Sequence, residues 1–98
     1  DRVYYNIPQL KDEQEAQISI LFNKNQPDNK SGILIKQRSN GFSDCVVWNP
    51  WIEKTKGLSD MPDEDFTRFI CAEAAVVGEP VVLQPSSVWN GQVQIQRQ

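Results

Sequence analysis

The chain has 98 residues, about the length of one small domain, and 39% of them are hydrophobic. Thirteen acidic and ten basic side chains give a net charge of −3, which excludes the basic surface that nucleic-acid binding requires. The sequence contains no apolar run near the roughly 20 residues that cross a bilayer. It also contains no histidine, so a mechanism that needs imidazole cannot be completed within it.

The first half of the chain predicts short strands separated by turns. Ile18, Ile20 and Phe22 recur at every second position, which is the period of a half-buried strand. Asn40-Gly41 is a strong signal for a tight hairpin turn. The predicted strands are residues 3–5, 17–22, 33–37 and 45–48, with turns or loops at 11–15, 23–32 and 39–41.

The second half continues the pattern with longer loops. Val93 and Ile95 alternate with glutamines, which is typical of an antiparallel sheet with one face in water. The segments are predicted as a loop at 52–62, one helical turn at 63–66, and strands at 69–77, 81–83 and 88–96. The fold class predicted from the whole pattern is all-β, with six to seven short antiparallel strands and no domain boundary.

The two cysteines, Cys45 and Cys71, both lie in apolar strand-like runs. Free cysteine behaves as a small hydrophobic residue, so we expect buried free thiols in a reducing compartment, the cytosol or an organelle interior. Two cysteines without histidine or a C-x-x-C spacing do not form a closed ligand set, and no metal site is predicted.

Glu73 is the main candidate for chemistry because it is a carboxylate in the middle of an apolar strand. At period two it shares one face with Phe69, Cys71 and Ala75. Burying an ionised carboxylate is costly unless it is paired or its pKa rises, so such a group is a candidate acid or base. The alternatives are a glutamate paired with an arginine across the sheet, or one that points to solvent on an outer face.

Trp48 and Trp51 flank Asn49-Pro50 at the end of a strand. Aromatic rings beside fixed polar groups suit the apolar faces of sugars. The alternative is that Trp48 fills the core and Trp51 covers a sheet edge. From the residues alone, Asp1 and Arg2 are a solvated pair of charges.

These stretches, taken in order, resemble the C-terminal third of the glucose-6-phosphate 1-epimerases, which are hexose-6-phosphate mutarotases related to aldose 1-epimerase. In plants they are also called apospory-associated protein C. The Val-Val-Trp-Asn-Pro-Trp and Cys-x-Glu-Ala-Ala blocks together make the resemblance specific. The matching segments are residues 1–4, 41–51, 53–54, 59–66, 69–75, 79–81, 83–85 and 89–91.

The resemblance implies a large antiparallel β-sandwich, the galactose-mutarotase-like supersandwich, of which residues 1–98 would form one C-terminal segment, with the N-terminal part absent. It implies interconversion of the α and β anomers of a hexose 6-phosphate, with no metal or organic cofactor. Glu73 matches the family's catalytic base, and Asp1 matches a substrate-binding aspartate. Trp48 and Trp51 would line or support the sugar pocket.

The histidine acid and the phosphate-binding arginines lie upstream in the family, so we expect this chain alone not to turn over. Its partners would be a hexose 6-phosphate and either the missing N-terminal portion or a larger assembly. One alternative is a non-catalytic relative that serves as a structural or scaffolding subunit. Another is a stand-alone carbohydrate-binding β-sandwich, which the exposed-aromatic interpretation of the tryptophans allows.

Overall fold

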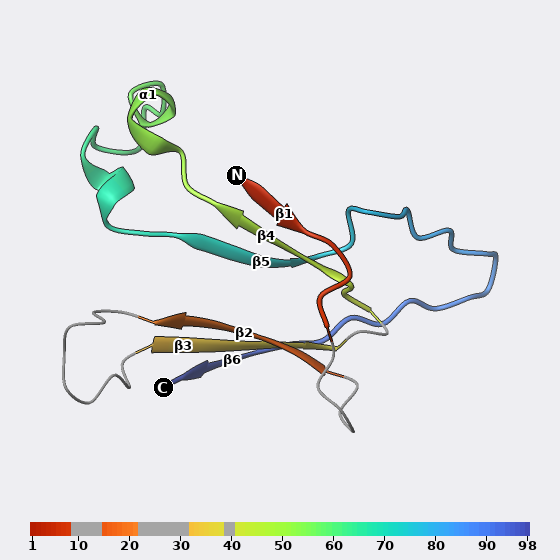
Figure 1. Cartoon of the computed structure of the whole chain (residues 1–98). Coiled ribbons are helices and arrows are strands. Elements are labelled where there is room, and N and C mark those ends of the chain that lie inside the picture. Colours follow the sequence, from red (N-terminus) through yellow and green to blue (C-terminus); the bar gives the residue numbers. More distant parts are fainter. Residues whose placement is uncertain (9–14, 22–31, 39–40) are drawn as a thin grey trace.

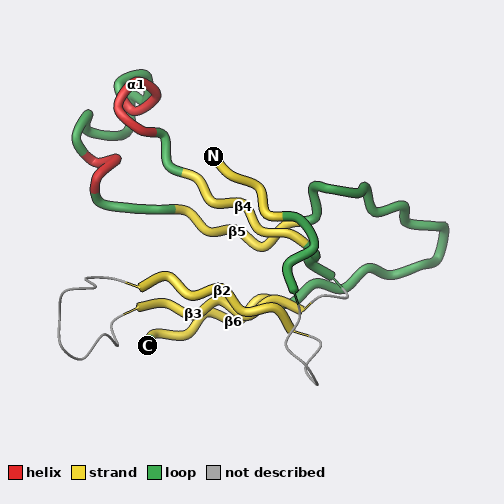
Figure 2. The backbone as a smooth tube through the Cα atoms, in the orientation of Figure 1, coloured by secondary structure: helices red, strands yellow, loops and turns green. Residues whose placement is uncertain are grey.

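The computed structural model describes residues 1–8, 15–21, 32–38 and 41–98, which form two antiparallel three-stranded sheets. The two sheets lie one above the other (Figures 1 and 2). This arrangement confirms the all-β prediction and is that of a β-sandwich. The first sheet has the order β1 (Arg2–Tyr4), β4 (Asp44–Trp48), β5 (Cys71–Ala75), and the second has the order β2 (Glu15–Leu21), β3 (Gly32–Arg38), β6 (Val93–Arg97).

The second sheet has one apolar face and one polar face, as the alternation in the sequence predicts. Ile35 lies opposite Ile18 on β2 and opposite Ile95 on β6, so an isoleucine row crosses the sheet. The neighbouring row is Gln17, Lys36 and Gln94, and its side chains point to the other face. The isoleucine face is directed at the first sheet.

The first sheet is built on β4, which is apolar on both faces. Tyr4 and Ala74 lie opposite Cys45, and these side chains face the second sheet. Val3 and Glu73 lie opposite Val46, and their side chains face away from it. A strand with apolar residues on both faces gives a continuous apolar run in the sequence, so residues 45–48 show no alternation.

The elements beyond the sheets differ from the sequence prediction in two places. Residues 51–55 form a short helix, α1 (Trp51–Thr55), where a loop was expected, and the chain enters it at Trp51 with φ of 61°. The predicted helical turn is present as a 3₁₀ turn, η1 (Asp65–Thr67). Residues 81–83 do not form a strand, although their composition favours one, because a strand needs a partner and none of the described residues pairs with them.

Two smaller differences concern element bounds. The strand predicted at 69–77 is limited to Cys71–Ala75, and that predicted at 88–96 begins only at Val93. The predictions for residues 11–14, 22–31 and 39–40 lie outside the described residues. Neither α1 nor η1, the helices in the described ranges, is long and apolar enough to cross a membrane.

The chain encloses little core of its own. Among the described residues, the only buried hydrophobic side chains are those of Ala16, Ile35 and Cys45. The accessible area is 7836 Å², whereas a self-contained protein of 11.2 kDa exposes roughly 5,700 Å². The radius of gyration is 16.4 Å against about 13 Å for a compact domain of this length. The two sheets therefore leave much apolar surface uncovered.

Candidate active site

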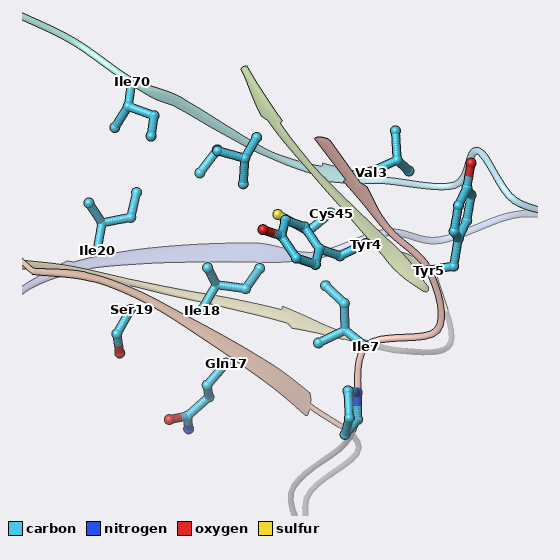
Figure 3. Close-up of a pocket in the computed structure, with 13 residues that line it drawn as sticks. Val3, Tyr4, Tyr5, Ile7, Gln17, Ile18, Ser19, Ile20, Cys45 and Ile70 are labelled. Atoms are coloured by element: carbon cyan, nitrogen blue, oxygen red, sulfur yellow. The ribbon is translucent and has the colours of Figure 1, made fainter. Parts of the chain in front are cut away.

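An open apolar cleft of about 620 Å³ lies between the two sheets. Figure 3 shows Ile18 and Ile20 pointing into it from β2, and Tyr4 and Cys45 meeting them from the first sheet. Ala72 also lines the cleft from β5. Among the described residues that line it, the ionisable groups are the hydroxyls of Tyr4 and Tyr5 and the Cys45 thiol, whose pKa is raised by burial. The cleft is the interior of the sandwich and not the place where Glu73 lies.

Glu73 lies on the opposite face of the first sheet from this cleft. Its neighbour Ala72 points into the cleft, so strand alternation turns Glu73 outward, beside Val46. The side chain is exposed, and none of the described ion pairs involves it. Glu73 therefore matches the alternative stated from the sequence, a carboxylate that points to solvent on an outer face, and the apolar side chain of Val46 beside it does not bury it. An exposed carboxylate is accessible to a substrate hydroxyl.

Trp48 shares this outer face with Glu73, and the alternation of β1, continued by one residue, places Asp1 there as well. Asp1 precedes Val3 by two residues, and Val3 lies in the same cross-strand row as Val46 and Glu73. Asp1 and Glu73 are thus two strands and two residues apart, a Cα separation of roughly 12 Å. β4 runs between the two residues and presents Val46 and Trp48 on the same face.

Trp48 is half-buried at the end of β4, directly opposite Cys71. Its ring packs against Phe69 at a centroid distance of 6.2 Å, on the same outer face. The aromatic pair gives that face an apolar floor at the end farther from Asp44. Packing against Phe69 is also what the core-filling alternative expects, and the geometry accommodates both roles.

Trp51 lies away from these residues, beyond the end of β4. It begins α1, is 66% exposed, and its ring meets the edge of Phe66 at 5.3 Å. Asn49 organises this corner: its Oδ1 accepts the Trp51 N–H at 2.9 Å, and its Nδ2 donates to the carbonyls of Phe66 and Phe69 at 2.8 Å each. The outer face therefore carries Trp48 and Glu73, with Asp1 placed on it by strand alternation, and Trp51 lies at its margin.

Asp44 is the residue that sequence reasoning missed. Its side chain is 1% exposed and accepts three backbone N–H groups, from Asn6 at 3.0 Å and from Val77 and Gly78 at 2.8 Å each. The N–H groups of Gly78, Asn6 and Val77 lower the pKa of Asp44 to about 2, against the opposing effect of burial. The available signal was a charged residue at the start of a strand that is apolar on both faces.

The described residues offer no other reactive cluster. Cys45 is buried and Cys71 is half-buried, and both are free thiols. Within the described ranges, no three side chains among Cys, Asp and Glu come together as a possible metal site. The outer face of the first sheet is therefore the best candidate for chemistry.

Comparison with known proteins supports the resemblance found in the sequence. The chain is 31% identical over 93 residues to a curated "Putative glucose-6-phosphate 1-epimerase" from Cenchrus ciliaris. The match covers 95% of this chain but 24% of that relative, so the chain spans about a quarter of the relative's length. No family model and no solved structure matches the chain.

Proposed function

We propose that this chain supplies the catalytic base of a hexose-6-phosphate 1-epimerase, with Glu73 in that role. The observation that carries the proposal is the shared outer face of Asp1, Trp48 and Glu73 in a chain similar to a protein named as such an epimerase. An exposed carboxylate opposite a second carboxylate, with an aromatic floor, suits a polar sugar ring that has one apolar side.

In this proposal Glu73 removes the proton from the C1 hydroxyl of the sugar. The ring oxygen is protonated at the same time, the C1–O5 bond breaks, and the open chain rotates about the C1–C2 bond. Closure on the other face of C1 returns both protons and gives the opposite anomer. The acid is a group outside this chain, because the sequence contains no histidine.

The remaining side chains hold the sugar. Asp1 accepts hydrogen bonds from sugar hydroxyls across the face from Glu73, and Trp48 lies under the ring. Trp51, at the margin beside Phe66, supports the corner that carries Trp48. These roles need no metal or organic cofactor, and the phosphate group requires basic side chains from elsewhere in the polypeptide.

We also propose that the chain functions as part of a longer polypeptide. Its accessible area exceeds that of a self-contained protein of its mass by roughly 2,000 Å². One partner in a standard protein–protein interface contributes only about 800 Å². An excess of this size is expected if other parts of a longer polypeptide cover these surfaces permanently. The similar protein is about four times as long as this chain.

The test is anomer exchange of glucose 6-phosphate, measured by NMR magnetisation transfer on the longest polypeptide that contains this chain. Glu73→Gln keeps the shape of the side chain but removes the base, so exchange should fall about 100-fold or more. Glu53→Gln is the matched control, because Glu53 is an exposed residue of α1 that pairs only with Lys56 among the described ion pairs. Exchange that is undiminished in Glu73→Gln removes Glu73 from the mechanism.

The second candidate is a non-catalytic structural or scaffolding subunit of a larger assembly. The large uncovered apolar area and the absence of histidine favour it. The discriminating observation is the sequence upstream of Asp1. A histidine and paired arginines there support the enzyme, and their absence supports the scaffold.

A further inference from the structure

We propose that Asp44 is a positioning residue that sets the separation of Asp1 and Glu73 by fixing β1 and β5 in register on β4. The inference rests on the proposed function, because it assigns a purpose to the distance between the two carboxylates. It concerns a side chain that does not touch the sugar and acts through the strands that it holds.

The contacts of Asp44 join three segments that are far apart in the sequence. Oδ1 accepts the N–H of Asn6 at 3.0 Å, just after β1 ends. Oδ2 accepts the N–H groups of Val77 and Gly78 at 2.8 Å each, just after β5 ends. Among the described side chains, Asp44 is thus the one that hydrogen-bonds to the exits of both edge strands.

The register of β1 needs such a contact. β1 has three residues and, among the described strands, β1 and β5 each pair with β4 alone. A slip of β1 by two residues keeps Asp1 on the same face but moves it by about 7 Å, and a slip by one residue turns it to the cleft. Three ladder pairs discriminate weakly among these registers, whereas the buried Asp44 carboxylate accepts Asn6 in one register only.

Three features of the backbone around Asp44 also hold the strand exits in place. Asn6 has φ of 48°, a left-handed conformation that turns the chain as it leaves β1. The neighbouring Ile7 N–H donates to the carbonyl of Ser43 at 2.9 Å and reinforces the same register. A Cβ at Gly78 would lie 2.8 Å from Cδ1 of Tyr5, so the two strand exits approach as closely as a glycine permits.

The test compares Asp44→Asn with Asp63→Asn in the longest polypeptide that contains this chain. Asp63 is an exposed loop residue and serves as the matched control. Anomer exchange of glucose 6-phosphate gives kcat and KM per folded molecule, with the folded fraction taken from circular dichroism. We expect Asp44→Asn to lower kcat/KM about 100-fold with a change in both kcat and KM, because misplacement of substrate-holding groups by an ångström has effects of this size.

A merely structural role would lower the folded fraction and leave kcat and KM per folded molecule unchanged, and that result overturns the inference. If Asp44→Asn does not fold, Asp44→Glu takes its place, because the longer side chain keeps the charge but moves the carboxylate away from the three N–H groups that it accepts. Native kcat and KM in a folded Asp44→Glu protein also overturn the inference.

A second measurement separates this inference from the proposed function. Hydrogen exchange at the amides of Val77 and Gly78, and the nuclear Overhauser contact between Val3 and Val46, report the register without any substrate. If the wild-type protein shows no anomer exchange, the proposed function fails, while faster amide exchange and a lost Val3–Val46 contact in the folded variant still support register control. An unchanged register in Asp44→Asn contradicts the inference whatever the activity.

Discussion

Asp44 is ionised although it is almost fully excluded from water, and this has a consequence for stability against acid. Three N–H groups hold its pKa at about 2, below the ordinary value of 3.8. A carboxylate with a lowered pKa in the folded state stabilises the protein above its unfolded pKa. That contribution is lost as pH falls from about 4 toward 2.

We therefore predict that Asp44→Asn costs about 2 kcal/mol at neutral pH, the scale of hydrogen bonds to a charged group. The difference from wild type should shrink as pH falls from about 4 toward 2. Urea unfolding at a series of pH values measures it, and Asp63→Asn should show no such trend. A difference that stays constant down to pH 2 would show that the Asp44 charge does not stabilise the fold.

Asn49 provides a second prediction at the scale of one residue. Its amide donates to two carbonyls and accepts one N–H, so Asn49→Asp replaces both donors with a carboxylate oxygen facing the carbonyls of Phe66 and Phe69. We expect a loss of about 2 kcal/mol or more in the free energy of unfolding, measured by urea titration. Asn90→Asp, on an exposed loop, is the matched control.

The sequence predicted the face of Glu73 but left its exposure open between a buried carboxylate and one that points to solvent. The face follows from the two-residue period of a strand, which is a local property. Exposure depends on what packs on the outer face of the sheet, which no local pattern records. Asp44 was missed for a related reason: its partners are 33 to 38 positions away along the chain.

At the scale of elements, the strands with an apolar alternation were predicted correctly and the exceptions depend on distant partners. β2, β3 and β6 follow the isoleucine row, and β4 follows its continuous apolar run. α1 was missed because its five residues are too short for a helical period, and Asn49 fixes its start through a hydrogen bond. Residues 81–83 have strand composition, but composition does not supply a hydrogen-bonded neighbour.

Residues 81–83, which pair with none of the described residues, give a prediction about a single element. Val82 is 77% exposed, flanked by the exposed side chains of Val81 and Leu83. If a strand from a longer polypeptide pairs with it, its amides should exchange quickly in the 98-residue chain and slowly in the longer protein. Hydrogen–deuterium exchange with mass spectrometry measures the difference, and the amides of β3 serve as an internal reference. Equal, fast exchange in both proteins would show that nothing pairs with the segment.

At the scale of the whole molecule, the uncovered apolar area predicts the behaviour of the chain in isolation. Ile95 is 69% exposed on β6, and both β6 and β2 are sheet edges. Exposed apolar edges promote association between chains. We expect the 98-residue chain alone to self-associate in sedimentation velocity and to bind a hydrophobic dye, and the longer polypeptide to do neither. A monomeric chain that binds no dye would contradict this expectation.

β4 separates two different environments with a single layer of backbone. Cys45 and Val47 face the apolar cleft, whereas Val46 and Trp48 face the outer surface on which the sugar is proposed to bind. A change in side-chain volume on the cleft side, at Val47 or Ala72, therefore shifts the outer face directly, because only the sheet backbone lies between the two faces. In laboratory evolution, substitutions at these cleft-facing positions can therefore change how the outer face fits a ligand, although the ligand does not contact them.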